Sequence, residues 1–439
     1  MRTAFFRGGR LASISLLLAG SSPAAVAHDR PSVRLTPNGV DDTAQLQAAL
    51  TACSGARPAC KISLSKGVFH TDVLLVRDFK GRIQGQGARH TIVRPITGRP
   101  LRSTEVPFLE DPTLEEPYPV LLHFADGGDI RLADFTLEFP GEMRVEPYTV
   151  VEPIADALLS AIMVDGTETA RLVVSGLKII AAADDARLAS FGSNLLNAIR
   201  FEGQIRLVAD IDTATPLAGG EFIAYDTHIR SAGLGFALRD VTNVDARIVD
   251  NHVQDARLIG VFLTDMGNSH ARVAGNRISS ELVGIQILRG VRPPEEPSSF
   301  DVIDNAFAIN ERGTSLFGPG GGVAFFDVTP DGGIDRASVS HNDIALGVEV
   351  FDGVFVLGDR GGVRIGGNRI SGPALEAGIN IWDSRGTRTR HNRFPGLEPG
   401  LADVRLNSGT SECRVIEPEA TVLDEGTDNH VEAKTVIKP

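Results

Sequence analysis

Apolar residues alternate with variable ones in short blocks that recur along the second half of the chain. Each block opens with a glycine, and the clearest are GFALRD from Gly235, GVFLTD from Gly260, GIQILR from Gly284, GVAFFD from Gly322, GVFVLG from Gly353 and GINIWD from Gly378. Alternation with a period of two is typical of a strand that buries one of its faces. The blocks therefore predict one short strand in every repeat.

An asparagine recurs at a fixed phase relative to these blocks, and an apolar residue follows it two positions later. The asparagines are Asn251, Asn276, Asn305, Asn342, Asn368 and Asn392, with spacings of 25, 29, 37, 26 and 24 residues. Such a period indicates a solenoid, in which each repeat needs only its neighbours to bury a core. We expect three short strands per turn and, at one bend, an asparagine that bonds to the next asparagine and to the backbone. The predicted fold is all-β, a single-stranded right-handed parallel β-helix.

The beginning of the repeat region carries a different pattern. The segment GVDDTAQLQAALTAC predicts a capping helix over 41–53, with Asp41 or Asp42 as N-cap and Leu46, Ala49 and Leu50 on one face. A solenoid needs such a cap over its first turn.

The segments DDTAQLQAAL, LSKGVFHT and GRIQGQGARHTIV, together with the asparagine repeats, resemble the pectate-lyase-like superfamily over most of residues 38–398. The resemblance reaches the superfamily and no single family within it. It implies a site on the outward face of the strand that follows the third bend, which here is the GVFLTD-type block. Family signatures are missing: TDMGN at Thr264 only faintly resembles the NTD of polygalacturonases, and GHG, RIK, the WIDH and RxPxxR of pectate lyases and the DPHD of alginate epimerases are absent.

The chain divides into three parts. Residues 1–27 are expected to be a signal peptide, because three arginines, an apolar stretch over 11–18 and Ala25-Val26-Ala27 follow one another. The apolar stretch is too short to anchor the chain in a bilayer, so we expect no membrane span and a periplasmic or secreted protein. The β-helix is expected over 28–398, and a C-terminal cap and tail over 399–439.

Charge and cysteine usage narrow the possible partners. The formal net charge of −13 excludes a general electrostatic attraction to nucleic acid. Cys53 and Cys60 enclose a short loop in a compartment that permits oxidation, which predicts a disulfide, with two buried thiols as the alternative. Cys413 is left over.

The residues at the ends of the recurring strands form a column of Asp240, Asp265, Arg289, Asp327, Gly358 and Asp383. Long segments after Arg289 and before Gly322 predict two loops that wall a cleft over 260–327. Asp265 and Asp327 would lie two turns apart, roughly 9–10 Å between backbones, a separation that suits an inverting glycosidase. Arg289 between them could hold a sugar carboxylate or neutralise an enolate. The alternative is structural, since Asp at a strand end often bonds the following turn and alternating charges avoid repulsion.

Four further residues are candidates for substrate binding on the same strands: Gln286, Thr264, Arg239 and Trp382. Trp382, the only tryptophan, shares an outward phase with Leu288, Phe326 and Leu357. This apolar stripe could stack sugar rings, or it could be covered by a loop or a second subunit.

A second column contains Arg131, Arg171, Arg247, Arg272, Arg364 and Arg388. These arginines could bind an anionic chain, or they could pair with nearby acids on a solvated face.

Two functions follow as hypotheses. The first is an exported carbohydrate-active protein that cleaves a polysaccharide by hydrolysis or elimination, without a required cofactor. The second, favoured by the missing signatures and the 6% of aromatic residues, is a non-catalytic binding or surface-interaction module. A third hypothesis is a lyase or epimerase whose strand-end acids hold Ca²⁺.

Overall fold

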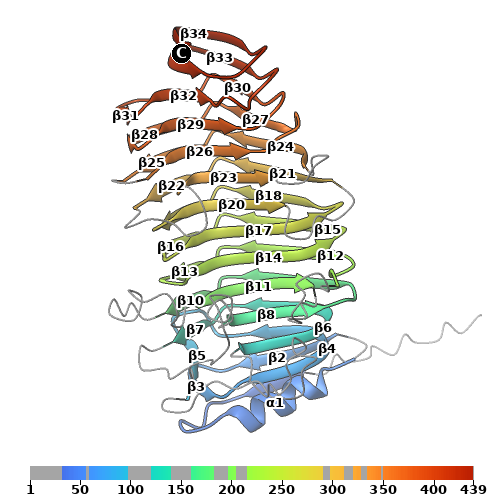
Figure 1. Ribbon diagram of the computed structural model, residues 1–439. Helices are drawn as coiled ribbons and strands as arrows, with labels where there is room; N and C mark the ends of the chain where they lie inside the picture. Colours follow the sequence, from blue (N-terminus) through green and yellow to red (C-terminus); the bar gives the residue numbers. More distant parts are fainter. Residues whose placement is uncertain are drawn as a thin grey trace, which may run out of the picture.

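The computed structural model describes residues 32–55, 59–96, 120–139, 160–181, 196–203, 215–289, 297–310, 320–327, 334–347 and 350–438. The expected signal peptide lies outside these residues. The described chain forms a right-handed parallel β-helix, a tall coil in which successive turns stack from the N-terminus to the C-terminus (Figure 1). The predicted fold is confirmed. No helix among the described residues is long and apolar enough to cross a membrane.

Each turn contributes one strand to each of three faces of the coil. Strands of the first face are β8 (Ser160–Gly166), β11 (Asn197–Gly203), β14 (Leu234–Thr242), β17 (Ile259–Gly267), β20 (Val283–Arg289), β23 (Gly321–Asp327), β26 (Asp352–Leu357), β29 (Ala377–Trp382) and β32 (Ala402–Leu406). Strands of the second face are β1 (Ser32–Leu35), β2 (Cys60–Leu64), β9 (Ala170–Ser175), β12 (Gly220–Tyr225), β15 (Val244–Val249), β18 (His270–Ala274), β21 (Ser298–Ile303), β24 (Ile334–Ser340), β27 (Val363–Gly366) and β30 (Arg388–Arg390). The long strands β4 (Leu74–Gln84) and β6 (Val120–Ala133) run through both faces, pairing in parallel with each other.

The third face is an 11-stranded parallel sheet of its own. Its strands are β3 (Gly67–Thr71), β5 (Thr91–Pro95), β7 (Thr136–Phe139), β10 (Lys178–Ala181), β13 (His228–Arg230), β16 (His252–Ala256), β19 (Arg277–Ser280), β22 (Ala306–Ile309), β25 (Asp343–Leu346), β28 (Arg369–Ala374) and β31 (Leu397–Pro399). Because equivalent residues of successive turns are register partners, side chains of one phase stack into columns. The apolar columns that point inward, such as Val261, Ile285, Val323, Val354 and Ile379, form one continuous core.

The asparagine ladder predicted from the repeat is present along the bend between the second and third faces. Asn276 is representative: its Nδ2 donates to Asn305 Oδ1 at 2.9 Å and to Ile248 O at 2.8 Å, and its backbone N donates to the same Oδ1 at 3.0 Å. The same three bonds recur from Asn251 to Asn368, and all six side chains are buried. The ladder thus satisfies buried polar groups of the bend and fixes the register between turns.

The ladder ends on two residues that are not asparagines. On the N-terminal side, the backbone N of Thr227 donates to Asn251 Oδ1 at 3.0 Å. On the C-terminal side, Asn392 donates from its N and Nδ2 to the two carboxylate oxygens of Glu417, at 2.8 and 2.6 Å. Burial raises the pKa of Glu417 above the ordinary value, although the hydrogen bonds from Asn392 oppose this shift.

The residue before each ladder asparagine has a left-handed backbone. These residues are Asp250, Gly275, Asp304, His341, Gly367 and His391, with φ between 54° and 69°. Asp, Asn, His and Gly tolerate this conformation better than other residues. The bend therefore restricts two successive positions of each repeat.

The single described helix, α1 (Thr43–Ala52), lies at the N-terminal end of the coil (Figure 1). Leu46, Ala49 and Leu50 are buried in the core, and Gln47 exchanges hydrogen bonds with the backbone of Leu75. Of the two expected N-caps, Asp42 holds the position, but its side chain accepts from the side chain of Gln45 and makes no capping bond to the helix backbone. Its carboxylate accepts instead from the backbone N of Asn38 and of His70, which ties the entry of the helix to β3.

Cys53 and Cys60 form a disulfide between the end of this helix and β2, with their Cα atoms 5.4 Å apart. Cys413 is a buried free thiol.

Regular pairing continues past residue 398, where a C-terminal cap and tail had been expected. β32 pairs with β29, β33 (Arg414–Asp424) pairs with β30 and β32, and β34 (His430–Ile437) pairs with β33, all in parallel. The asparagine repeat does not extend to these turns, because Glu417 occupies the position at which the next asparagine would stand.

Removing one ladder side chain should destabilise the whole coil. In Asn305→Ala, the backbone N of Asn276, the carbonyl of Val273 and the amide of Asn342 lose a partner. We expect the free energy of unfolding to fall by at least about 3 kcal/mol, because each unsatisfied buried group costs about 1–3 kcal/mol. Urea unfolding followed by circular dichroism measures it. The exposed Asn310→Ala serves as the control, and an equal loss in both variants would contradict the ladder's role.

Candidate functional site

The structure brings Asp265, Arg289 and Asp327 together at the ends of β17, β20 and β23. Arg289 and Asp327 are register partners, and Asp265 directly follows Thr264 on the neighbouring strand. All three are buried. Burial lowers the pKa of Arg289 below the ordinary value of arginine, and the nearby charges of Asp327 and Asp265 oppose this shift.

The backbone conformation offers a structural explanation for the residue types found in this column. Asp265 is left-handed, with a φ of 47°, and so are Asp240, Gly358 and Asp383 of the same column. Arg289 Nη1 donates to the carbonyl oxygen of Met266 at 3.1 Å, within the same bend. The column is therefore explained in part by the turn that it forms. The expected loop segments 290–296 and 311–319 lie outside the described residues, so the cleft and the catalytic roles stay predictions.

Three of the predicted binding residues lie on the outward side of the first face. Arg239 and Thr264 are register partners on β14 and β17, and Gln286 on β20 pairs with Phe262. Thr264 and Gln286 are buried, although they point away from the core of the coil. Arg239 is also the register partner of Glu202 on β11. The column that contains Thr264 and Arg239 therefore continues to Glu202, in the N-terminal half of the same face.

That half contains a cluster of four buried ionisable side chains that sequence reasoning missed. His123 lies on β6, Asp165 on β8, and Arg200 and Glu202 on β11, with exposed fractions of 1%, 2%, 1% and 0%. Asp165 and Glu202 are register partners. Charges are rarely buried unless they are paired, and an outward-facing cluster of this kind marks a candidate site.

His123 and Asp165 form a hydrogen-bonded pair. His123 Nε2 lies 3.0 Å from Asp165 Oδ2. His123 Nδ1 is buried and has no hydrogen-bond partner among the described residues. One imidazole nitrogen is thus held by a carboxylate, and the other is left available for a hydrogen bond to a ligand.

Arg200 and Glu202 form the second pair. Arg200 donates from Nε to one Glu202 carboxylate oxygen at 3.0 Å and from Nη2 to both oxygens at 2.7 Å. The next residue in the column, Arg239, has a buried Nε with no partner among the described residues. The column Asp165–Glu202–Arg239–Thr264 thus presents carboxylate, guanidinium and hydroxyl groups on four adjacent strands.

A signal in the sequence could have pointed to this cluster. The blocks LLHFADGG, SAIMVDG and NAIRFEG are first-face strands that carry charged or titratable residues at outward positions, and at the phase of Arg200 the next strands carry Ala237 and Phe262. Long segments without a repeat, 96–119, 140–159 and 182–196, precede these three strands. The asparagine column begins only at Asn251, so the phase of the earlier turns could not be assigned.

Trp382 belongs to a different part of the first face. It lies on β29, four strands from Thr264 and therefore roughly 20 Å away. Its Nε1 donates to Asn380 Oδ1 at 2.8 Å, and the guanidinium of Arg405 lies 5.4 Å from the centre of its ring. The predicted apolar stripe is present, since Leu288, Phe326, Leu357 and Trp382 are successive register partners.

Beside Trp382 lies a carboxylate with a strongly shifted pKa. Asp352 is fully buried at the start of β26, and its Oδ2 accepts from Asn380 Nδ2, which also donates to Glu376. Burial raises the pKa of Asp352 to about 8, and the charge of Glu376 adds to this shift. Arg405 in turn donates to Glu376 at 2.8 Å.

Within the residues that the structure describes, no group of three or more His, Cys, Asp or Glu side chains is arranged to hold a metal ion. The hypothesis of a Ca²⁺ site at the strand-end acids is therefore carried by the sequence alone.

Several solved structures resemble this chain. The A-module of the mannuronan C-5 epimerase AlgE6 from Azotobacter vinelandii is 14% identical, with 91% of this chain and 95% of that chain covered and a TM-score of 0.44. The polygalacturonase from Erwinia carotovora ssp. carotovora is 12% identical, with 93% and 97% covered and a TM-score of 0.44. The catalytic unit of a GH87 α-1,3-glucanase from Streptomyces thermodiastaticus is 15% identical, with 94% and 70% covered and a TM-score of 0.42.

No family model matches the chain, and no curated protein is significantly similar to it in sequence. The resemblance to the pectate-lyase-like superfamily therefore stays an interpretation of the sequence, and the parallel β-helix rests on the strand pairing of this chain itself. Proteins this distant do not assign a reaction, so the proposals below rest on the residues of this chain.

Asp352 should make the stability of the protein depend on pH. Its pKa is higher in the folded protein than the ordinary value of 3.8, so its stabilising contribution is complete below about pH 4 and is lost as the pH rises through 8. We expect the free energy of unfolding of the wild type to fall by at least about 1.4 kcal/mol, one pKa unit, between pH 5 and 8.5.

Asp352→Asn should flatten this dependence, whereas the exposed Asp343→Asn should keep it. Denaturant unfolding at a series of pH values measures both. A wild-type slope that persists in Asp352→Asn would show that another group causes it.

Proposed function

We propose that this protein is an exported carbohydrate-active enzyme that cleaves a uronate-containing polysaccharide by β-elimination on the first face, across β6, β8, β11 and β14. The observation that carries the proposal is the buried His123, whose Nε2 is held by Asp165 while Nδ1 has no partner among the described residues.

His123 would act as the general base. An ionised Asp165 can only accept a hydrogen bond, so the neutral imidazole keeps its proton on Nε2 and offers Nδ1 as an acceptor. Nδ1 takes the proton from the carbon next to the sugar carboxylate. The electron pair left behind forms a carbon–carbon double bond, the bond to the glycosidic oxygen breaks, and that oxygen takes up the proton from the imidazolium, which returns His123 to its neutral form. Asp165 stabilises the imidazolium that forms.

Arginine would stabilise the charge that builds up on the sugar carboxylate. Arg239 has a buried Nε without a partner among the described residues, and it lies next to Glu202 in the register. A guanidinium binds a carboxylate through two parallel hydrogen bonds, and such donors stabilise an enolate-like transition state. Arg200, already held by Glu202, would fix the position of that glutamate beside Arg239.

We favour elimination over hydrolysis because both carboxylates of the cluster, Asp165 and Glu202, are already engaged in hydrogen bonds with other side chains. Hydrolysis needs one carboxyl group as acid and another as base or nucleophile. Here Asp165 is engaged by His123, and both oxygens of Glu202 are engaged by Arg200. Asp265, Arg289 and Asp327 would support the bend at the C-terminal side of the substrate. A non-catalytic module is the competing function, and the assay below separates the two.

The disulfide supports export. Disulfides persist in oxidising compartments, and Cys53–Cys60 agrees with the arginine-led, apolar N-terminal segment of the sequence. We therefore propose a periplasmic or secreted location.

Loss of the base should abolish turnover without unfolding the protein. We expect His123→Gln to lower kcat on polygalacturonate or alginate by about 10²–10⁴-fold, the usual contribution of a general base. The readout is the absorbance of the unsaturated product, with and without a chelator. The exposed His228→Gln is the matched control. No unsaturated product from any uronate polymer by the wild type would favour the binding module.

Asp265→Asn distinguishes this site from the one predicted at the strand ends. Asparagine tolerates the left-handed backbone of Asp265. We expect kcat to stay within about threefold of the wild type, while thermal unfolding shifts downward. A loss of kcat as large as that of His123→Gln would instead place the chemistry at Asp265.

A further inference from the structure

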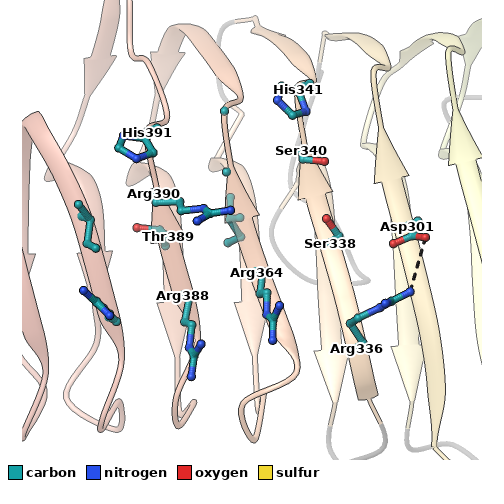
Figure 2. Close-up of a pocket in the computed structure, with 15 residues that line it drawn as sticks. Asp301, Arg336, Ser338, Ser340, His341, Arg364, Arg388, Thr389, Arg390 and His391 are labelled. Carbon is teal, nitrogen blue, oxygen red and sulfur yellow. Dashed lines mark ion pairs between the residues drawn. The ribbon is translucent and has the colours of Figure 1, made fainter.

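A groove of about 800 Å³ lies on the outer side of the second face, towards the C-terminal end of the coil. The residues that line it come from β21, β24, β27, β30 and β33, and they include small side chains such as Ser338 (Figure 2). The groove belongs to a different face from the proposed catalytic cluster.

The charge of this groove is opposite to that of the protein. Five arginines line it, against the single carboxylate of Asp301: Arg336, Arg364, Arg388, Arg390 and Arg414. The whole chain carries a formal net charge of −13. Arg336 lies 3.9 Å from Asp301, and the other four arginines form no ion pair with any acid that the structure describes. His341 and His391 stand along one edge of the groove (Figure 2).

Three of the arginines stack directly on one another. Arg364 is the register partner of Arg388, and Arg388 of Arg414. Their backbones are therefore about 4.8 Å apart from one turn to the next. Like charges directly opposite each other on neighbouring strands destabilise a sheet. The column therefore needs negative charge from outside its own strands.

Elsewhere on the second face the chain supplies that charge itself. Arg131 pairs with Asp129 at 3.3 Å, Arg171 pairs with Asp129 and Glu221, and Arg247 pairs with Asp245. Arg171, which the sequence had placed in the same column, is instead the register partner of Asp129 and Glu221. The column itself changes from the paired Arg131 and Arg247 to Arg364, Arg388 and Arg414, which have no described acidic partner. The alternative of arginines paired with nearby acids is found at Arg131 and Arg247, and the binding of an anionic chain stays a proposal for the other end of the column.

We propose that this groove binds a linear carboxylated polysaccharide, independently of the reaction on the first face. Guanidinium groups bind carboxylates in a bidentate manner. A sugar residue in an extended glycan advances by a length comparable to the spacing between turns, so one carboxylate can meet each arginine of the column. The hydroxyl groups of the sugars would meet Ser338, Ser340 and the histidines at the edge.

Nucleic acid is the less suitable polyanion. Sites for single strands combine basic grooves with aromatic side chains on which bases stack. No Phe, Tyr or Trp lines this groove.

Direct binding tests the proposal. The ligand is an oligogalacturonate, titrated calorimetrically at low salt into protein carrying Arg239→Gln, so that first-face binding is weakened. Adding Arg364→Gln and Arg388→Gln should raise Kd at least tenfold. The charge-matched pair Arg131→Gln and Arg247→Gln, on the same face but with acidic partners, should leave Kd within twofold.

Four outcomes would overturn the proposal: no binding, an unchanged Kd in the groove variant, an equal loss in the charge-matched variant, or binding of neutral dextran, inorganic phosphate or an oligonucleotide as tight as that of the uronate. In otherwise wild-type protein, the groove variant should keep the kcat of elimination on a short oligomer. A failed assay for elimination therefore leaves this test intact, and the reverse also holds.

Discussion

The hydrogen bonding between successive turns is the constraint on which the rest of this structure depends. Each strand satisfies its backbone only through the turn before and the turn after. At the bend between the second and third faces, the side-chain amides of Asn251 to Asn392 satisfy the buried polar groups by bonding from one turn to the next. Because these amides bond in one register only, a residue of a given phase must lie on top of its equivalent in the next turn. The columns of side chains on all three faces follow from this.

When the turns stack, a residue type that recurs at one phase becomes a continuous column of like side chains. Apolar columns make a core, whereas charged columns need compensation at the spacing of the turns. On the first face, charged side chains are neutralised by partners within the protein: His123 pairs with Asp165, and Arg200 pairs with Glu202. On the second face, Arg131, Arg247 and Arg336 have acidic partners, whereas Arg364, Arg388 and Arg414 have none among the described residues. The two proposals rest on these two features: the buried cluster around His123 and the arginines that line the groove.

The sequence sufficed to predict the architecture where the repeat was regular. From Asn251 onward, glycine-led strands and asparagines recur, and the predicted ladder and apolar stripe are found as expected. The ends of the ladder could not be predicted, because Thr227 and Glu417 perform the role of an asparagine with other groups. For the same reason, the sequence predicts only a cap and tail beyond residue 398, where the structure has further paired strands.

The candidate site was harder to predict for a related reason. His123, Asp165, Arg200 and Glu202 are separated by long segments without a repeat, and only the register of β6, β8 and β11 brings them to one surface. The strand-end acids form the clearer pattern in the sequence because they recur at a fixed phase. Asp240, Asp265 and Asp383 recur because a left-handed bend favours aspartate, which is a requirement of the backbone.

A crystal structure of the protein with a bound oligouronate would test the central claim most directly. The account predicts a sugar on the first face, with its carboxylate on Arg239 and the adjacent carbon within reach of His123 Nδ1. A sugar bound at Asp265 and Asp327 with no contact to His123, or a His123 Nδ1 that donates to a protein carbonyl, would contradict it.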